Sequence, residues 1–320
     1  MARQLEELER IAANPAPPTF ENTIAAMERS GRLLDRAASV YGIYSSTLSD
    51  ATVQQVERDI EPKLAAFRDR ITQNERLFRR IEAVYEARER SGLSAEQQRL
   101  AWLQYTGFVR AGARLAAPAK QRLSEVNQRL AALYTRFSQN LLADEADRHL
   151  LIEQPADLAG LPESVRDGAA ADAAARGHPG RWLIANTRSS VEPFLTWSTR
   201  RDLRERVWRT FVKRGDNADE RDNKQIVAEV LQLRTERARL LGYPTHAHWR
   251  LEDSMAGTPE RALQLMQSVW QPAVARAGGS RGDAGLRGAR RCDALRIEPG
   301  TTAITREGPR GHATRSTPMR

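Results

Sequence analysis

The sequence predicts a mainly α protein of long antiparallel helices, with a small α/β insert and a disordered C-terminal tail. Three observations support this fold class. Apolar residues recur at intervals of three and four through most of the chain, which lines one face of a helix. Two short apolar runs near the middle are bounded by Pro and Gly, as the strands of a small sheet often are. Residues 278–320 show neither pattern.

The first 142 residues are predicted to form a stack of helices. Apolar stripes cover residues 33–44, 53–71 and 123–141, and each is long enough for a helix of several turns. Amphipathic stripes of this kind are buried when helices pack against one another. We therefore expect these stripes to face a core.

Residues with capping chemistry stand where several of these helices should begin. Thr19 and Asp50 can each accept a hydrogen bond from a backbone N–H of the first turn. Ser94 and Gln97 have the spacing of a reciprocal capping box. Pro118 is favoured in a first helical turn, where its missing N–H is not needed.

The pattern changes near Asp147. Residues 149–152 and 181–184 are the two runs predicted to be strands, and the Ala-rich segment 162–176 between them is predicted to be helical. Helical spacing returns after Thr199, which is placed to cap the next helix. The middle of the chain is therefore expected to hold a small α/β insert.

Two further helices are expected before the tail. One ends at Gly242, because glycine readily takes the left-handed conformation found just after a helix. The other begins at Thr258, followed by Pro at the first helical position and by Glu near the positive end of the helix dipole. The predicted parts of the chain are a helical domain over 1–146, the insert over 147–188, a helical segment over 189–277 and the tail over 278–320.

The tail differs from the rest of the chain in composition. It contains eight of the 20 glycines and no Lys, Phe, Trp or Tyr, so it cannot bury enough apolar surface to fold alone. A frame slip just after Ala277 in a GC-rich gene would give such a segment. We interpret the chain as truncated or frameshifted there, and we expect that its true start lies before Met1.

The net charge of +9 suggests a nucleic-acid partner until the distribution of the charge along the chain is considered. Residues 281–320 hold nine Arg and four acids, whereas the other 280 residues hold 41 basic and 37 acidic side chains. The body of the chain is therefore nearly balanced. Its arginines are spread over every predicted helix, which indicates a solvated, salt-bridged surface and no nucleic-acid partner.

The remaining composition limits the compartment and the kinds of site. Cys292 is the single cysteine, which excludes an intrachain disulfide and a cysteine-based zinc site. No apolar run reaches membrane-spanning length, and no apolar signal core follows Met1. We expect no membrane partner and a cytoplasmic location, with the periplasm as an alternative if the true N-terminus is missing.

One contiguous segment indicates a known family. It reads Asn14-Pro15-Ala16-Pro17-Pro18-Thr19-Phe20-Glu21-Asn22-Thr23-Ile24, followed by Glu28 and Ser30-Gly31. Further matching segments follow in order: Ser91-Gly92-Leu93, residues 108–113, residues 181–184, Leu240-Leu241-Gly242-Tyr243, Met255-Ala256 and Thr258-Pro259-Glu260. With these segments the chain resembles the thimet-oligopeptidase-like zinc metallopeptidases, family M3, and within them it is most similar to bacterial peptidyl-dipeptidases. The resemblance covers about residues 1–277, less than half of a full-length member.

The resemblance implies the N-terminal helical half of a zincin-like oligopeptidase. In that family this half forms one wall of a deep channel, so the domain over 1–146 is expected to be channel wall and the segment over 189–277 to lead toward the catalytic domain. The other half holds zinc through a His-Glu-x-x-His helix and a later Glu. Residues four apart share a helix face, so both imidazoles reach one ion while the Glu acts on its bound water.

This zinc motif is absent from the sequence. None of the histidines is followed by Glu, and none has a second His four residues on; they are His149, His178, His246, His248 and His312. We therefore expect no catalytic, cofactor-binding or metal-binding residue in this chain. Zinc is expected only in full-length members of the family.

Other groups of residues are interpreted without a chemical role. His246 and His248 are two apart and would face different directions on a helix. His149 and Glu153 are four apart, which would suit a helix, but residues 150–152 between them are predicted to be strand. Two acidic groups are interpreted as solvated surface, and five tryptophans as core packing. These residues are Asp144, Glu145, Asp147, Glu252 and Asp253, and Trp182, Trp197, Trp208, Trp249 and Trp270.

The sequence thus predicts part of a zinc-dependent peptidyl-dipeptidase, a hydrolase of short peptides, in a monomeric chain that itself lacks peptidase activity. Oligopeptides are the expected partners. One alternative is a non-catalytic helical peptide-binding module, which an exposed apolar face between residues 190 and 277 would favour. Another is a basic nucleic-acid-binding helical protein, which would need a contiguous Arg face.

Overall fold

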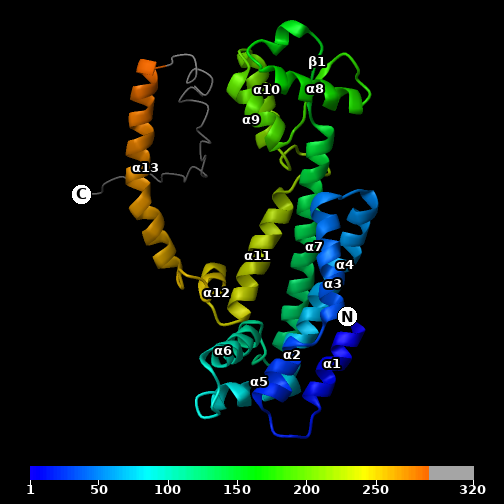
Figure 1. The fold of residues 1–320 in the computed structure, drawn as a ribbon, viewed down its shortest axis with the longest axis vertical. Coiled ribbons are helices and arrows are strands. Elements are labelled where there is room, and N and C mark those ends of the chain that lie inside the picture. Colours follow the sequence, from blue (N-terminus) through cyan, green and yellow to red (C-terminus); the bar gives the residue numbers. More distant parts are fainter. Residues whose placement is uncertain (288–320) are drawn as a thin grey trace, which may run out of the picture. The chain divides into compact units, whose positions relative to one another are not determined.

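The computed structural model describes residues 1–287 of the chain, and the mainly α fold class predicted from the spacing is confirmed (Figure 1). These residues divide into two compact units. Unit 1 joins Met1–Asp147 to Lys213–Val269, and unit 2 joins Arg148–Val212 to the described residues from Trp270 onward. No described helix is both long enough and apolar enough to cross a lipid bilayer.

Unit 1 is built from helices. The longest, α7, packs along α4, and α11 packs against α7 as well (Figure 1). The helices are α1 (Ala2–Ala12), α2 (Ala26–Glu28), α3 (Arg32–Thr47), α4 (Ala51–Thr72), α5 (Glu75–Ala87), α6 (Ala95–Arg110), α7 (Ala117–Asp147), α11 (Lys224–Leu240) and α12 (His246–Leu251).

Two clusters of buried side chains form the core of unit 1. One joins α1, α5 and α6, and it includes Leu8, Leu77, Ile81 and Phe108. The other joins α7 to α11 and is formed by Val126, Leu130, Leu133, Ile226 and Val230. The predicted stripe on α7 therefore faces a core, as its helical spacing indicates.

Local capping chemistry is confirmed at several helix ends. The N–H of Val53 donates to Asp50 Oδ1 at 2.8 Å, at the start of α4. Ser94 and Gln97 exchange both bonds of a capping box, at 2.9 and 3.3 Å. Gly242 follows α11 with φ of +83°, the left-handed conformation expected there.

The helix predicted after Thr19 begins with a wider turn than an α-helix has. Phe20–Ala25 form a π-helical turn that continues into α2, and Thr19 caps it with Asn22 as its reciprocal partner. The buried guanidinium of Arg80 donates to the carbonyl of Asn14 at 2.8 Å and to Asn22 Oδ1 at 2.9 Å. Contacts from α5 therefore stabilise a turn whose geometry the capping residues alone do not determine.

Unit 2 contains the two predicted strands. β1 (Leu150–Ile152) and β2 (Trp182–Ile184) pair antiparallel, with Leu151 opposite Leu183. The Ala-rich segment forms α8 (Glu163–Ala175), as predicted. Two further helices, α9 (Arg188–Trp197) and α10 (Arg201–Val212), complete the unit around the buried Phe194 and Val207.

The predicted cap at Thr199 is wrong. Its hydroxyl donates to the carbonyl of Ala159 at 3.1 Å, so it is engaged in a tertiary contact. Ser198 lies one residue earlier, and its Oγ accepts from the N–H of Arg200 at 3.2 Å. A neighbouring hydroxyl therefore binds the backbone at the start of α10.

Two helices do not bury the apolar stripes that predict them. No residue of α3 is buried, and Leu33 is 62% exposed. On α13 (Pro259–Arg287), Leu263, Met266 and Trp270 are all more than half exposed. Helical spacing predicts the helix correctly here, but burial also requires a partner surface.

The last helix also extends past the predicted start of the tail. Thr258 caps α13 as predicted, because the N–H of Arg261 donates to its hydroxyl at 3.3 Å. The helix continues to Arg287, ten residues beyond Ala277. The remaining part of the predicted disordered tail, residues 288–320, lies outside the described residues, as do Cys292 and His312.

Candidate functional site

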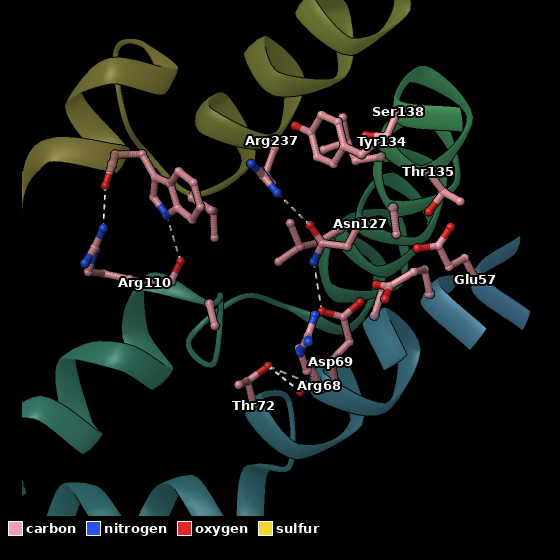
Figure 2. Close-up of a pocket in the computed structure, with 18 of the residues that line it drawn as sticks. Glu57, Arg68, Asp69, Thr72, Arg110, Asn127, Tyr134, Thr135, Ser138 and Arg237 are labelled. Carbon is pink, nitrogen blue, oxygen red and sulfur yellow. Dashed lines mark hydrogen bonds between the residues drawn. The ribbon is translucent and has the colours of Figure 1, made fainter. Parts of the chain in front are cut away.

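Unit 1 contains a cavity of about 670 Å³ (Figure 2). Its walls come from α3, α4, α7, the end of α6, α11 and α12, so residues far apart in sequence meet there. Small-molecule sites in proteins are clefts of about 300–1,000 Å³ with a few convergent polar groups. Charged side chains of both signs line this cavity, which makes it the candidate site.

Three side chains from three helices form a hydrogen-bonded series across the cavity wall. Asn127 of α7 donates from Nδ2 to Asp69 Oδ1 of α4 at 2.8 Å. Arg237 of α11 donates to Asn127 Oδ1 at 3.3 Å. Figure 2 shows the amide of Asn127 between the carboxylate and the guanidinium. The two charged groups therefore both contact the amide that lies between them.

Both charged groups are short of partners. Asp69 is 6% exposed, and its Oδ2 is buried without a hydrogen-bond partner. Burial raises the pKa of Asp69, although hydrogen bonds from Asn127 and Ser124 and the positive charges of Arg237 and Arg68 act in the opposite direction. The Nε of Arg237 is likewise buried without a partner, and burial lowers the pKa of its guanidinium. Desolvation therefore disfavours the charged form of each group.

An arginine and a tryptophan hold α12 at another side of the cavity. Arg110 donates to the carbonyl of Trp249 at 2.5 Å, and the indole N–H of Trp249 donates back to the carbonyl of Arg110 at 3.1 Å (Figure 2). Arg110 also pairs with Glu252 at 3.0 Å and with Asp253. The Arg237 guanidinium lies 4.5 Å from the Trp249 ring centroid, in cation–π geometry.

Acidic side chains lie on the α3–α4 side of the cavity. Tyr41 donates to Glu61 at 2.8 Å, and burial together with this carboxylate raises the pKa of the Tyr41 hydroxyl. Glu57 lines the same side (Figure 2). The cavity thus has a more acidic wall on α4 and a more basic wall formed by Arg110 and Arg237.

The comparisons with known proteins agree with the resemblance seen in the sequence. A model of peptidase family M3 matches residues 194–279. The dipeptidyl carboxypeptidase of Escherichia coli is 35% identical over 277 residues, which cover 87% of this chain. The chain belongs to peptidase family M3.

Other relatives carry related names. The dipeptidyl carboxypeptidase of Salmonella typhimurium is 35% identical over 267 residues, which are 83% of this chain and 39% of that relative. Oligopeptidase A of Haemophilus influenzae is 29% identical over 255 residues, which are 78% of this chain and 37% of that relative. The match to the Escherichia coli protein covers 41% of its length. The chain therefore spans about two fifths of the length of these family M3 relatives.

The described residues of this family M3 chain do not fit a zinc site. His246 lies 5.5 Å from the Trp249 ring, whereas Nδ1 of His248 contacts the hydroxyl of Thr245 at 2.8 Å. The two histidines thus have different neighbours, as their spacing of two predicts. Among the side chains that the structure describes, those of residues 1–277, no three His, Cys, Asp or Glu are grouped so that they could hold a metal ion.

His149 and Glu153, four residues apart, are separated by a strand. His149 and Glu153 lie on either side of β1, which confirms the strand predicted between them. Glu153 pairs with Arg181 at 2.7 Å. An ion pair at the edge of the small sheet therefore accounts for Glu153.

The interpretation of the first acidic group as solvated surface is wrong for Asp144. This carboxylate is fully buried and accepts from the N–H of Gly215 and from Asn217 Nδ2, both at 2.8 Å. Its neighbour Asp147 pairs with Arg221 at 2.6 Å. The loop before α11 returns to the end of α7, and that long-range contact buries a residue that the sequence places at a helix end.

The tryptophans do not share one environment. Trp182 packs against the core of unit 2, as predicted. Trp249 instead lines the cavity, and Trp197 and Trp270 are 40% and 65% exposed, so core packing is the wrong interpretation for these three. The side chains of Glu252 and Asp253 are about half exposed, and both pair with Arg110.

Sequence reasoning missed the residues that line the cavity, although a signal exists for two of them. Asn127 lies on the apolar face of α7, between Leu123 and Leu130 at helical spacing. Arg237 occupies a similar place on α11, seven residues after Val230. A polar side chain within an apolar stripe suggests a buried polar contact. The spacing does not show which other residue it meets.

Proposed function

We propose that residues 1–277 are the non-catalytic helical part of a family M3 peptidyl-dipeptidase. The observation that supports this is the 35% identity to the two proteins named dipeptidyl carboxypeptidase. Under this proposal the helices of 1–146 form channel wall, 147–188 is an insert, and 189–277 lead toward the zinc-binding part of the enzyme. The ligands are short peptides. The zinc and the catalytic residues belong to that other part.

The 320-residue polypeptide is expected not to hydrolyse peptides. Its sequence contains no His-Glu-x-x-His, and the chemistry of a zinc peptidase needs two imidazoles and a carboxylate around one ion. The polar groups of the cavity can bind and orient a peptide, but they do not supply the activated water that attacks the scissile carbonyl.

Peptide hydrolysis by the purified chain tests the proposal. The chain is incubated with an N-blocked tripeptide and zinc, with and without a chelator, and dipeptide release is followed by mass spectrometry. The dipeptidyl carboxypeptidase of Escherichia coli serves as the positive control. We expect no release above that of a mock preparation from the same host. Dipeptide release that a chelator abolishes and zinc restores would overturn the proposal.

A second candidate is a stand-alone peptide-binding module. Exposed apolar side chains between residues 190 and 277 favour it, and they include Val212, Val227, Leu231, Leu263, Met266 and Trp270. Fluorescence anisotropy with a labelled unstructured oligopeptide separates the candidates, because only a module that works alone binds the peptide without further polypeptide. Saturable binding supports the module. If the anisotropy does not change on titration, the first proposal stands.

We further propose a monomer in the cytoplasm with no nucleic-acid or membrane partner. Many arginines of unit 1 lie in ion pairs, such as Arg122 with Glu236 and Arg129 with Glu229, each at 2.6 Å. These pairs reduce the positive charge available to phosphates. Binding to duplex DNA with a steep salt dependence would contradict this part of the proposal.

A further inference from the structure

We propose that the cavity of unit 1 binds a small zwitterion of the amino-acid or dipeptide class. Its carboxylate pairs with Arg237 and its ammonium group pairs with Asp69. The inference does not depend on peptide hydrolysis, because it requires only the groups that line this cavity.

The first reason is that Arg237 is a partly buried cation without an ion-pair partner. Among the described residues, no carboxylate lies within 4.0 Å of its guanidinium. One N–H donates to Asn127 Oδ1 at 3.3 Å, the long end of the normal range, and Nε has no acceptor. Buried guanidinium groups are normally paired, often with two parallel bonds to a carboxylate. A ligand carboxylate would complete this set.

The second reason is that Asp69 is a buried anion with an incomplete set of hydrogen-bond donors. It is almost fully buried. The amide of Asn127 donates to Oδ1 and the nearby Ser124 hydroxyl also lowers the pKa of Asp69, yet Oδ2 has no donor in hydrogen-bonding geometry. Buried polar atoms of folded proteins nearly always have a partner, so an orphan oxygen on a residue that lines a cavity indicates a place for a donor. An ammonium group supplies that donor together with the opposite charge.

The third reason is the spacing of the two groups. A single side-chain amide, that of Asn127, separates the carboxylate of Asp69 from the guanidinium of Arg237 (Figure 2). An extended dipeptide spans at most about 7 Å, so its two charged ends match a gap of this kind. A ligand with one charge would complete only one of the two groups and leave the other unpaired.

The rest of the wall suits an organic zwitterion. Trp249 and Tyr134 offer aromatic surface, and Leu130 offers apolar surface, for the side chains of such a ligand. Glu57 and Glu61 line the α4 side of the cavity together with Arg68, so this wall also carries both signs of charge. An inorganic anion would meet the guanidinium but also these carboxylates, so charge complementarity favours the zwitterion.

Calorimetry on the intact 320-residue chain tests the proposal with four probes. They are alanine, alanyl-alanine, N-acetyl-alanyl-alanine and alanyl-alanine amide. We expect at least one of the two free zwitterions to bind, and we expect each blocked dipeptide to bind at least tenfold more weakly than free dipeptide. Preference for alanine over alanyl-alanine identifies an amino-acid site, and the reverse preference a dipeptide site. Absence of binding by both zwitterions, or equal binding of the blocked forms, overturns the proposal.

Two variants assign the ends of the ligand. Asp69→Asn should weaken binding of the free zwitterion at least tenfold. It should also remove the loss of affinity caused by N-acetylation of the ligand, while the loss caused by amidation remains. Arg237→Gln should remove the loss caused by amidation, while the loss caused by N-acetylation remains. The matched controls are Asp59→Asn on α4 and Arg239→Gln on α11, which replace exposed residues of the same helices and should bind as the wild type does. Wild-type selectivity in both cavity variants overturns the assignment, and the blocked ligands on wild type test it even if a variant fails to fold.

Discussion

Two charged side chains of unit 1, one buried and one partly buried, lack a full set of partners. Asp69 has an orphan oxygen, and Arg237 has an orphan Nε and no carboxylate within ion-pairing distance among the described residues. Each unsatisfied buried group lowers stability by about 1–3 kcal/mol. Groups that reduce stability and face a cavity are more readily explained by binding than by folding.

The cost of burying the charged form of Asp69 predicts that Asp69→Asn changes the stability of the fold in a pH-dependent way. Because burial raises the pKa of the folded carboxyl, the fold binds this proton more tightly than the unfolded chain does. Its contribution to stability therefore falls as pH rises from the ordinary aspartate value of about 3.9 through the raised pKa. Asparagine does not ionise, so the variant should be more stable than wild type by roughly 1 kcal/mol at neutral pH.

Urea unfolding at neutral pH and near the ordinary aspartate pKa measures this difference. The advantage of Asp69→Asn should shrink at the acid end, where the wild-type carboxyl is protonated as well. Asp59→Asn, on the exposed side of the same helix, should show no such change with pH. A variant that is destabilised equally at both pH values would show that the hydrogen bond from Asn127 outweighs the burial of charge.

Sequence reasoning identifies single polar residues on apolar faces, but not their contacts. Asn127 and Arg237 interrupt apolar stripes, so each could be suspected of a buried role. They are 110 residues apart, and only the packing of α11 on α7 brings them together. Asp144 was misjudged for the same reason, because the N–H that it accepts from belongs to Gly215.

Helices and strands are the scale at which the sequence predicts best. The caps at Asp50, Ser94 and Thr258 involve residues three apart, so the chemistry is contained in a short segment. Thr199 instead contacts Ala159, forty residues away, and the neighbouring Ser198 accepts from the backbone at the start of α10. The apolar stripe of α3 (residues 32–47) also remains exposed, since periodicity predicts a face but not what covers it.

Gly160 gives a prediction for the loop before α8. Its φ is +87°, and an added Cβ would lie 2.3 Å from the carbonyl oxygen of Trp197, which is backbone and cannot move freely. Positive φ alone costs a residue with a side chain about 1–2 kcal/mol, and the clash adds to it. Gly160→Ala should lower the free energy of unfolding of unit 2 by roughly 3 kcal/mol, measured by denaturant unfolding.

Gly168 provides the matched control within the same unit. It lies inside α8, and a Cβ there would meet no atom within 4 Å. Gly168→Ala should therefore raise stability by about 0.5–1 kcal/mol, since alanine favours the helix more than glycine does. Equal effects of the two substitutions would contradict the assigned conformation and close contact at Gly160.

At the scale of the whole chain, the contiguous family segment near Thr19 is more informative than composition. Net charge alone suggests a nucleic-acid partner, whereas the matching segments predict family M3, and the relatives at 35% identity confirm it. Helical periodicity does not predict which unit each helix joins. The sequence of α10 has ordinary helical spacing, and this spacing does not show that Val207 is buried with Phe194 in the core of unit 2.

The cores predict that the two units unfold separately. Each of the four buried apolar clusters of the described residues draws its members from one unit alone. Cooperative unfolding depends on a shared core, and proteins with several domains often depart from a single transition. Calorimetry of the wild-type chain should therefore show two overlapping heat-absorption peaks.

Two substitutions assign these peaks and test their independence. Arg80→Met removes a buried guanidinium whose hydrogen bonds lie within unit 1, so it should lower only one midpoint. Gly160→Ala acts within unit 2 and should lower only the other. The exposed Arg79, replaced by Met, should leave both midpoints within a degree or two, roughly the effect of a surface change. If both substitutions instead shift one common transition, the units unfold together, and the chain behaves as a single cooperative fold despite its separate cores.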